Sequence, residues 1–390
     1  MTLASRLPEY PWDELAPIAE KARAFPGGAV DLSIGTPVDP VPAVIQDALV
    51  AAANAPGYPL TAGTPALRSA AAGWLARSLD VHVDPASVLP VIGTKEFIAW
   101  LPVMLGLGSG HTVIYPSLAY PTYDIGARLA GASSIAADTC DAGAPVGACD
   151  AGALDSACDA GALDGAPASA RLLWVNSPSN PTGRVLPGSA LRDALAWARS
   201  RGCVLASDEC YIELGWTASP VSVLHGSVRG GSLDGVLAVF SLSKRSNLAG
   251  YRAGFVTGDP SLMRDLLLVC RQAGLMVPGP VQAAMIAALS DDSHVVEQKS
   301  RYAARRAVLA AGLTAAGFRI DHSEAGLYLW ATRPGLDCWA ACELLAARCG
   351  ILAGPGSFYG PAGASHIRVA LTATDERVAT AGERLRALAG

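Results

Sequence analysis

Short apolar runs rich in β-branched residues alternate with longer Ala/Leu/Arg segments of helical period through the middle of this 390-residue chain. The runs are 88–92, 112–115, 172–175, 204–206 and 236–240. A crossover between parallel strands needs a connection the size of a helix, so this alternation predicts an α/β fold. We expect a large domain with a mostly parallel central sheet and helices on both faces.

The pattern changes near residue 265. Helical stretches that include 285–289 and 302–311 are followed by strand-like runs at 326–331 and 366–371 and a final helix at 375–388. At about 150 residues per domain, the length allows two to three domains. We therefore predict an amino-terminal arm that forms part of a small domain (1–44), a large domain (45–264) and a small α+β carboxyl-terminal domain (265–390).

The charge of the chain disfavours nucleic acid and membrane surfaces as partners. Charged residues make up 16%, the net charge is −5 and the pI is about 5.7, so no basic field is available. The longest uncharged stretch, 97–123, contains Pro102 and Gly106 near its start, whereas a membrane span needs about 20 apolar residues. The first residues place acidic side chains and prolines where a secretory signal needs an apolar run, so we expect a cytoplasmic protein.

Three cysteines recur every nine residues, in CDAGAPVGA, CDAGALDSA and CDAGALDGA; they are Cys140, Cys149 and Cys158. Three copies without a histidine are weak support for a metal site, and structural disulfides are rare in a reducing compartment. We interpret 139–169 as a duplicated surface loop, because lengthening a loop costs little. We expect no metal site in the chain.

A lysine follows the strand-like run 236–240, within Ser241-Leu-Ser243-Lys244, and Arg252 comes eight residues later. Ligands of a parallel sheet bind beyond the carboxyl ends of the strands. Burial and a nearby cation lower the pKa of an amine, which a Schiff-base nucleophile requires. The hydroxyls and Arg252 suit a phosphate. Alone, this motif is equally compatible with a surface lysine after a strand.

Two neighbouring strand ends carry polar groups that could bind the same ligand as Lys244. The run 204–206 leads to Asp208 and Tyr211, which can hold a pyridinium nitrogen protonated and donate to a ring oxygen. Asn180 lies in a turn stiffened by proline and glycine, so its amide is presented in a fixed direction. Singly, Asp208 is as compatible with a helix cap and Asn180 with a turn. Their order relative to Lys244 favours one common site.

Three further positions complete this candidate site. The sequence Gly93-Thr94-Lys95 opens a helix, whose amino terminus can receive a phosphate. Tyr120 follows another run and can stack on a flat cofactor. Arg368 lies on an apolar strand, where a buried guanidinium needs either a substrate carboxylate or an internal Asp or Glu.

Together, Asn180-Pro-Thr-Gly183, Asp208-x-x-Tyr211 and Ser241-x-Ser243-Lys244 resemble the motifs of the pyridoxal-phosphate aminotransferases of fold type I, the class I/II family. The resemblance covers nearly the whole chain outside 139–169. It implies the fold type I architecture and the cofactor pyridoxal 5′-phosphate. Lys244 matches the lysine that binds the cofactor covalently and later moves a proton, and Asp208 the partner of the ring nitrogen.

The same resemblance assigns the remaining residues. Tyr211 and Asn180 match the ligands of the cofactor 3-oxygen, and Tyr120 the stacking ring. Other cofactor-binding positions fall on Gly93, Thr94, Lys95, Ser241, Ser243 and Arg252. Substrate-binding positions fall on Gly35, Asn180 and Arg368, of which Arg368 matches the α-carboxylate arginine. Tyr58 matches a tyrosine that reaches the phosphate of the neighbouring subunit, which implies a homodimer with shared sites.

Segments 31–40, 90–96, 119–131 and 326–332 are similar to those of the N-succinyldiaminopimelate aminotransferases of high-G+C bacteria, a branch of this family. This similarity implies transamination between N-succinyl-L,L-diaminopimelate and 2-oxoglutarate/glutamate, on the diaminopimelate route to lysine. No motif is chemically tied to a succinyl group, so aspartate, aromatic or alanine transamination and a β-lyase reaction stay open. A regulator is disfavoured because no basic amino-terminal module is present. Arg23, Arg128 and Arg271 are equal candidates for binding a second substrate carboxylate.

Overall fold

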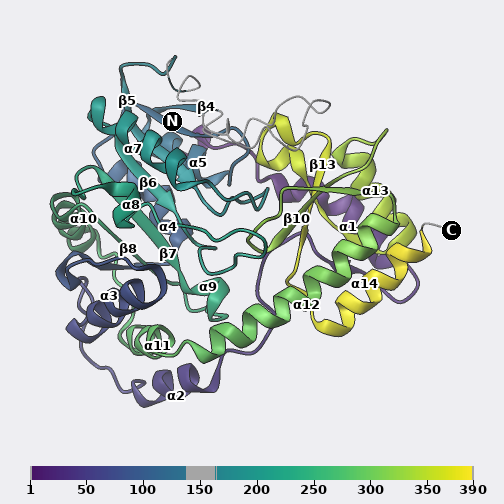
Figure 1. Ribbon diagram of the computed structural model, residues 1–390, viewed down its shortest axis with the longest axis horizontal. Helices are drawn as coiled ribbons and strands as arrows, with labels where there is room; N and C mark the ends of the chain where they lie inside the picture. Colours follow the sequence, from purple (N-terminus) through teal and green to yellow (C-terminus); the bar gives the residue numbers. More distant parts are fainter. Residues whose placement is uncertain (1, 138–162, 164, 389–390) are drawn as a thin grey trace.

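The computed structural model describes residues 2–137, 163 and 165–388, and the three repeat cysteines lie outside these residues. A seven-stranded sheet forms the centre of the larger part of the molecule, in the order β2-β8-β7-β6-β5-β3-β4 (Figure 1). The strands are β2 (Leu89–Ile92), β3 (Thr112–Pro116), β4 (Ser133–Ala137), β5 (Ala170–Asn176), β6 (Val204–Asp208), β7 (Val236–Ser241) and β8 (Ala253–Gly258). Only β8 runs against its neighbours, β2 and β7, so the predicted mostly parallel sheet is confirmed.

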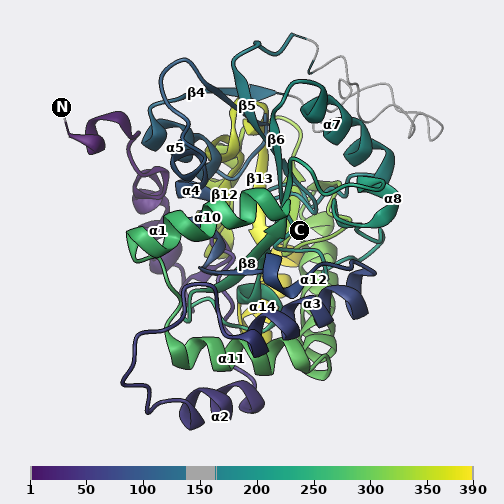
Figure 2. The same ribbon diagram turned by 90° about the vertical axis from the view of Figure 1, so that its left-hand side faces the viewer.

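Helices cover both faces of this sheet. One face packs against α4 (Thr94–Met104), α5 (Thr122–Ala130) and α10 (Pro260–Ala273). The other packs against α3 (Pro65–Leu79), α7 (Gly188–Ser200) and α11 (Gly279–Ser290). Helix α2 (Ala43–Ala51) lies on α11, as Figure 2 shows. The domain boundary expected after residue 264 falls inside α10. Because α10 and α11 both pack on the large sheet, the helices up to α11 belong to the large core, beyond that expected boundary.

The chain ends share a second, smaller core. An antiparallel sheet in the order β12-β13-β10-β9 and a parallel pair β1-β11 pack with four helices. The elements are α1 (Ala16–Ala24), β1 (Val30–Asp31), α12 (Ser293–Ala315), β9 (Arg319–Asp321), β10 (Tyr328–Thr332), α13 (Cys338–Cys349), β11 (Ile351–Leu352), β12 (Gly354–Pro355), β13 (His366–Ala370) and α14 (Asp375–Ala387). The amino-terminal arm therefore belongs with the carboxyl-terminal part.

Helix ends and surface charge follow the local sequence. Thr64, Asp259, Asp337 and Thr374 cap their helices, because each side chain accepts a backbone N–H that the first turn leaves free.

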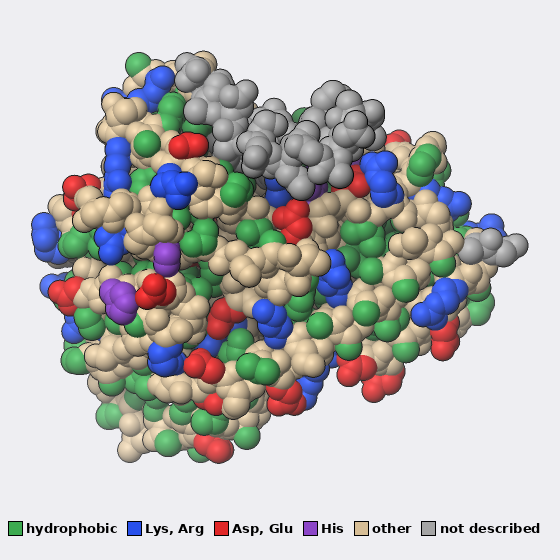
Figure 3. Space-filling view, in the orientation of Figure 1, with side chains coloured by type: hydrophobic (Ala, Val, Ile, Leu, Met, Phe, Trp, Pro, Cys, Tyr) green, Lys and Arg blue, Asp and Glu red, His purple; other side chains and the backbone are tan. Residues whose placement is uncertain are grey.

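Basic and acidic side chains are interspersed on the face seen in Figure 3. No helix in the described ranges is long and apolar enough to cross a membrane.

Strand register brings the motif-bearing loops level with one another. Asn176 at the end of β5 pairs with Asp208 at the end of β6, and Asp208 pairs with Val239 of β7. The parallel strands therefore end along one rim of the sheet, which faces the smaller core. The loops with Asn180, Asp208 and Lys244 leave from this rim.

A buried ion pair fixes the amino-terminal arm above the rim. Arg305 of α12 is 2% exposed and donates from Nη1 and Nη2 to both carboxylate oxygens of Asp39, at 2.8 and 2.6 Å. Its Nε donates to Asp375 at 2.7 Å, and Gln298 donates to Asp39 at 2.7 Å. This bidentate geometry holds the arm against α12.

We predict that Arg305→Ala lowers the free energy of unfolding by about 3 kcal/mol, because Asp39 is left buried without its partner. Urea unfolding checks this change. Arg301→Ala is the matched control on the same helix; its exposed pair with Glu297 is worth about 0.5 kcal/mol. Equal effects of the two substitutions would contradict the prediction.

Candidate active site

A cavity of about 290 Å³ opens at the rim between the two cores. The predicted residues that line it are Gly35, Thr94, Lys95, Tyr120, Asn180, Asp208, Tyr211, Ser241, Ser243, Lys244, Arg252 and Arg368. Gly93 lies directly behind Arg252, whereas Tyr58 is 98% exposed and is not part of the lining. The structure thus brings the predicted residues together, and their individual roles stay predictions.

Positive charge dominates this cavity. Lys95, Lys244, Arg252 and Arg368 line it, while Asp208 is the one carboxylate among the lining residues. Removing charges from water is costly unless they are paired. The cavity therefore suits a ligand with more than one anionic group.

Lys244 lies in the short helix α9 (Leu242–Arg245), directly after β7. Its Nζ donates to the carbonyl oxygen of Gly35 from the amino-terminal arm. Burial lowers the pKa of this amine, and the charges of Arg368 and Arg252 lower it further, whereas Tyr328 and Cys210 oppose the shift. A larger neutral fraction makes Lys244 a better nucleophile than an exposed lysine.

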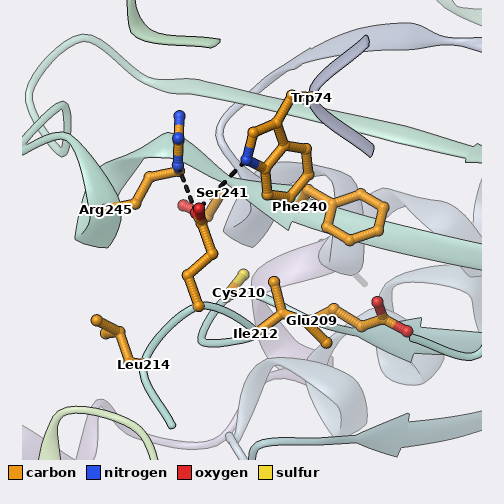
Figure 4. A pocket seen from close by; sticks show the side chains of 9 residues that line it. Trp74, Glu209, Cys210, Ile212, Leu214, Phe240, Ser241 and Arg245 are labelled. Atoms are coloured by element: carbon orange, nitrogen blue, oxygen red, sulfur yellow. Dashed lines mark hydrogen bonds and ion pairs between the residues drawn. The ribbon is translucent and has the colours of Figure 1, made fainter. Parts of the chain in front are cut away.

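Arg245, the residue after Lys244, anchors α9, and Figure 4 shows its contact with a carboxylate that Trp74 also binds. Arg245 is 5% exposed; its Nε binds Glu213 and its Nη1 donates to the carbonyl oxygen of Ala288 at 2.8 Å. The indole N–H of Trp74 donates to Glu213 at 3.2 Å, and the Arg245 guanidinium lies 5.3 Å from the Trp74 ring centre. These contacts leave the helix that carries Lys244 little freedom to move.

Asp208 is held by two donors at the end of β6. The Tyr123 hydroxyl donates to Oδ2 at 2.9 Å, and the backbone N–H of Cys210 donates to Oδ1 at 3.1 Å. Burial raises the pKa of this carboxyl, although the hydrogen bonds to Cys210 and Tyr123 oppose the shift. A positively charged N–H partner would stabilise the carboxylate, as a pyridinium nitrogen does.

Arg368 is 3% exposed and forms no ion pair among the described residues. It donates to Asn180 Oδ1 at 2.8 Å and to the Ser33 carbonyl oxygen at 2.6 Å, and its Nε has no partner. The predicted alternative, an internal Asp or Glu, is therefore not seen in this part of the chain. The arrangement favours an external carboxylate.

A phosphate-sized cradle surrounds the start of α4. Gly93 caps this helix at φ 75°, and a side chain there would collide with the guanidinium of Arg252. Thr94 and Lys95 form the first turn, where backbone N–H groups are free to bind an anion. Ser241 at the end of β7 and Ser243 in α9 add hydroxyls to the same cavity. The donor set fits a phosphate dianion.

Sequence reasoning missed several lining residues: Tyr10, Trp12, Ile34, Thr36, Cys210 and Tyr328. Tyr123, which holds Asp208, was also missed. Tyr328 carried no signal in the sequence. The structure shows that Arg368 pairs with Trp330 of β10, and Tyr328 lies two residues before Trp330, on the same face of that strand. Arg23, Arg128 and Arg271 are exposed and do not line the cavity, so none contacts a ligand there within one chain.

Comparison with known proteins gives the family. Residues 28–385 match the model of the aminotransferase class I and II family. This chain is a class I/II aminotransferase. It is 57% identical over 379 residues to the 4-dedimethylamino-4-oxo-anhydrotetracycline transaminase OxyQ of Streptomyces rimosus, covering 97% of this chain and 99% of that one. A probable aminotransferase of Mycobacterium tuberculosis is 56% identical, covering 98% and 86%.

Solved structures agree with this assignment. An aminotransferase from Neisseria meningitidis superposes with a TM-score of 0.88 at 31% identity, covering 100% of both chains. A probable N-succinyldiaminopimelate aminotransferase from Thermus thermophilus superposes with a TM-score of 0.83 at 29% identity, covering 97% of this chain and 99% of that one.

Class I/II aminotransferases use pyridoxal 5′-phosphate, and the residues present fit it. The cradle at α4 would hold its phosphate, Lys244 would bind its aldehyde, and the hydrogen-bonded Asp208 would face its ring nitrogen. When bound, the cofactor supplies the electron sink for the electrons released with the α-proton of an amino acid. The unpaired Nε of Arg368 leaves a donor for a substrate carboxylate.

We predict that Lys244→Ala abolishes transamination and the covalent attachment of the cofactor, because the amine forms the link to its aldehyde. Borohydride reduction followed by denaturation and mass measurement checks the link. Lys95→Ala is the control; this exposed lysine lines the same cavity, and its loss leaves the covalent adduct in place. A reduced adduct on the Lys244→Ala protein would contradict the assignment.

Proposed function

We propose that this aminotransferase moves an amino group between N-succinyl-L,L-diaminopimelate and 2-oxoglutarate/glutamate, in the cytoplasm, as a step of diaminopimelate and lysine biosynthesis. The observation that carries the reaction is a buried Arg368 with no carboxylate partner among the described residues, in one cavity with a lysine of lowered pKa. The substrate rests on the sequence likeness and on relatives named LL-diaminopimelate aminotransferase, 31% identical over 383 residues.

The residues divide the work by position. Arg368 binds the α-carboxylate, and Asn180, at 2.8 Å from its Nη1, keeps the guanidinium oriented. Lys244 Nζ would take the α-proton of the amino donor and deliver it to the aldehyde-derived carbon of the cofactor, on the other side of the substrate nitrogen. Asp208 keeps the cofactor ring nitrogen protonated, and Tyr120 covers the face of the ring.

An aromatic wall next to Arg368 supports a long substrate. Tyr10 and Trp12 line the cavity with their ring centres 5.6 Å apart and tilted by 31°, and Trp12 packs edge-on against Tyr359 at 6.4 Å. The Arg368 guanidinium lies 4.7 Å from the centre of that same Tyr359 ring. The methylene chain and the amide of a long substrate can pack on these aromatic faces, which the short side chain of aspartate does not reach. The further carboxylates of the succinylated donor then bind outside this wall.

A second candidate function is amination of a ketone on a planar polycycle. It is favoured by the 57% identity to OxyQ, a transaminase whose name specifies an anhydrotetracycline ketone, and by the same aromatic wall. The two candidate substrates differ in the group attached to the carbon that exchanges nitrogen: a flexible acylated chain in the first and a ring system in the second.

The test is a panel of amino donors with 2-oxoglutarate: N-succinyl-L,L-diaminopimelate, L,L-diaminopimelate, aspartate, phenylalanine and alanine. We predict the highest kcat/KM with the succinylated donor. Higher kcat/KM with any other donor would replace the proposal, and release of pyruvate and ammonia without a keto acid would indicate a lyase. Turnover of an anhydrotetracycline ketone alone would establish the second candidate.

The aromatic wall of Tyr10 and Trp12 allows a further prediction about selectivity between amino donors. Trp12→Ala removes about 1.5 kcal/mol of apolar contact and lowers kcat/KM about tenfold for the succinylated donor. Alanine, whose side chain ends before the wall, serves as the control substrate and keeps its kcat/KM. An equal fall for both donors would mean that Trp12 supports the fold rather than selects the substrate.

We also propose a homodimer in which Tyr58 completes the partner's site. Tyr58 is 98% exposed, and it lies in a segment whose apolar side chains are also exposed, among them Val50 at 72% and Leu60 at 57%. Burial of these side chains against a second copy would be favourable.

Mixing two weak variants tests the shared site. In a heterodimer of Tyr58→Ala and Lys244→Ala, one site keeps its own Lys244 and receives an intact Tyr58 from the partner. Random mixing should restore about a quarter of parental activity, since half of the dimers then hold one whole site of two. No gain over the separate variants would contradict the proposal.

A further inference from the structure

Tyr328 lines the cavity, although nothing in the sequence pattern assigned it a role. It is the first residue of β10, is 4% exposed and lines the cavity together with Lys244 and Arg368. Its position between the two cores places it in contact with both the cofactor-binding and the substrate-binding residues.

The hydroxyl of Tyr328 touches the cofactor side of the site. It lies 3.2 Å from the hydroxyl of Tyr211, and either oxygen can be the donor. It also lies so close to Gly35 that any side chain at that position would collide with it, and the Gly35 carbonyl accepts from Lys244. Tyr328 therefore requires a glycine where the arm meets the lysine.

The ring of Tyr328 touches the substrate side. The guanidinium of Arg368 lies 3.9 Å from the ring centre, within cation–π distance, and the Tyr359 ring covers Arg368 at 4.7 Å. Two aromatic faces thus hold a guanidinium that has no carboxylate partner among the described residues. Their contact fixes the plane in which Arg368 can bind a carboxylate.

We propose that Tyr328 is a positioning residue that acts on both halves of the site. Its hydroxyl donates to the oxygen of Tyr211, which strengthens Tyr211 as a donor to the cofactor 3-oxygen, and its ring orients Arg368 toward the substrate carboxylate. The inference rests on family membership and on the role proposed for Tyr211, and it holds for any amino donor. Hydrogen bonds in such a chain polarise one another, so the second bond gains from the first.

Surrounding charge supports this donor direction. Although burial opposes the change, Arg368 and Lys244 hold the pKa of Tyr328 below its usual value. Burial holds the pKa of Tyr211 well above its usual value, with Tyr328 adding to the shift. Other titratable groups around the pair are Cys210, Tyr120, Tyr302 and Tyr359.

The test of the hydroxyl is a pH titration of the visible absorbance of the bound cofactor in Tyr328→Phe. A hydrogen-bond donor to the cofactor 3-oxygen withdraws negative charge from that oxygen. The oxygen then stabilises the protonated imine nitrogen less well. Loss of the Tyr328 hydroxyl should therefore raise the pKa of the imine, by about half a unit. No shift, or a shift to lower pH, would overturn this half of the proposal.

Two controls separate positioning from general damage. Tyr328→Phe added to Tyr211→Phe should cause no further shift, because its effect passes through Tyr211. Tyr359→Phe loses a hydroxyl that has no hydrogen-bond partner, on the other ring that contacts Arg368, and should leave the imine pKa unchanged. A shift of equal size in Tyr359→Phe would assign the effect to packing around Arg368 and overturn the relay.

The ring is tested by substrate affinity. Tyr328→Phe keeps the aromatic face and should keep the KM for amino acids, whereas Tyr328→Leu should raise that KM at least fivefold with a smaller change in kcat. Retained visible absorbance shows that each variant is folded and loaded. An unchanged KM in Tyr328→Leu would overturn the second half of the proposal. Because the titration needs no substrate, its outcome is independent of whether the succinylated donor is correct.

Discussion

An excess of positive charge around a buried Arg368 is the constraint on which the site depends. Four cationic side chains and one carboxylate line the cavity, and Arg368 is enclosed by aromatic rings and by oxygen acceptors that carry no charge. The guanidinium of Arg368 is buried without a charged partner among the described residues, which is costly until an anion enters the cavity. Ligands of this kind stabilise the native state by mass action.

The site exists only where the two cores meet, and the chain crosses between them to build it. The amino-terminal arm supplies the carbonyl oxygens of Ser33 and Gly35, which accept from Arg368 and Lys244. The Arg305–Asp39 pair holds that arm on α12. Substrate recognition therefore draws on residues at opposite ends of the sequence, while cofactor binding draws on consecutive strand ends.

Sequence reasoning predicted the parts of the molecule that local pattern determines. Strand ends in a parallel sheet must converge, so Asp208, Asn180 and Lys244 could be brought together before any coordinates. The edge strand β4 was missed because its side chains are mostly exposed and small, and β8 because Gly254 and Gly258 leave only a short apolar run between them. Tyr328 was missed because its partner Tyr211 lies 117 residues away, and only the β10–β13 register makes the contact visible.

The reversed direction of β8 has a geometric consequence. Because β8 starts at the rim where β7 finishes, the connection that leaves with Lys244 returns with Arg252 at the same edge. One short connection thus presents an amine at its start and a guanidinium at its end to the same cavity. We expect the fixed span between these two groups to favour a ligand whose aldehyde and phosphate are separated by the matching length.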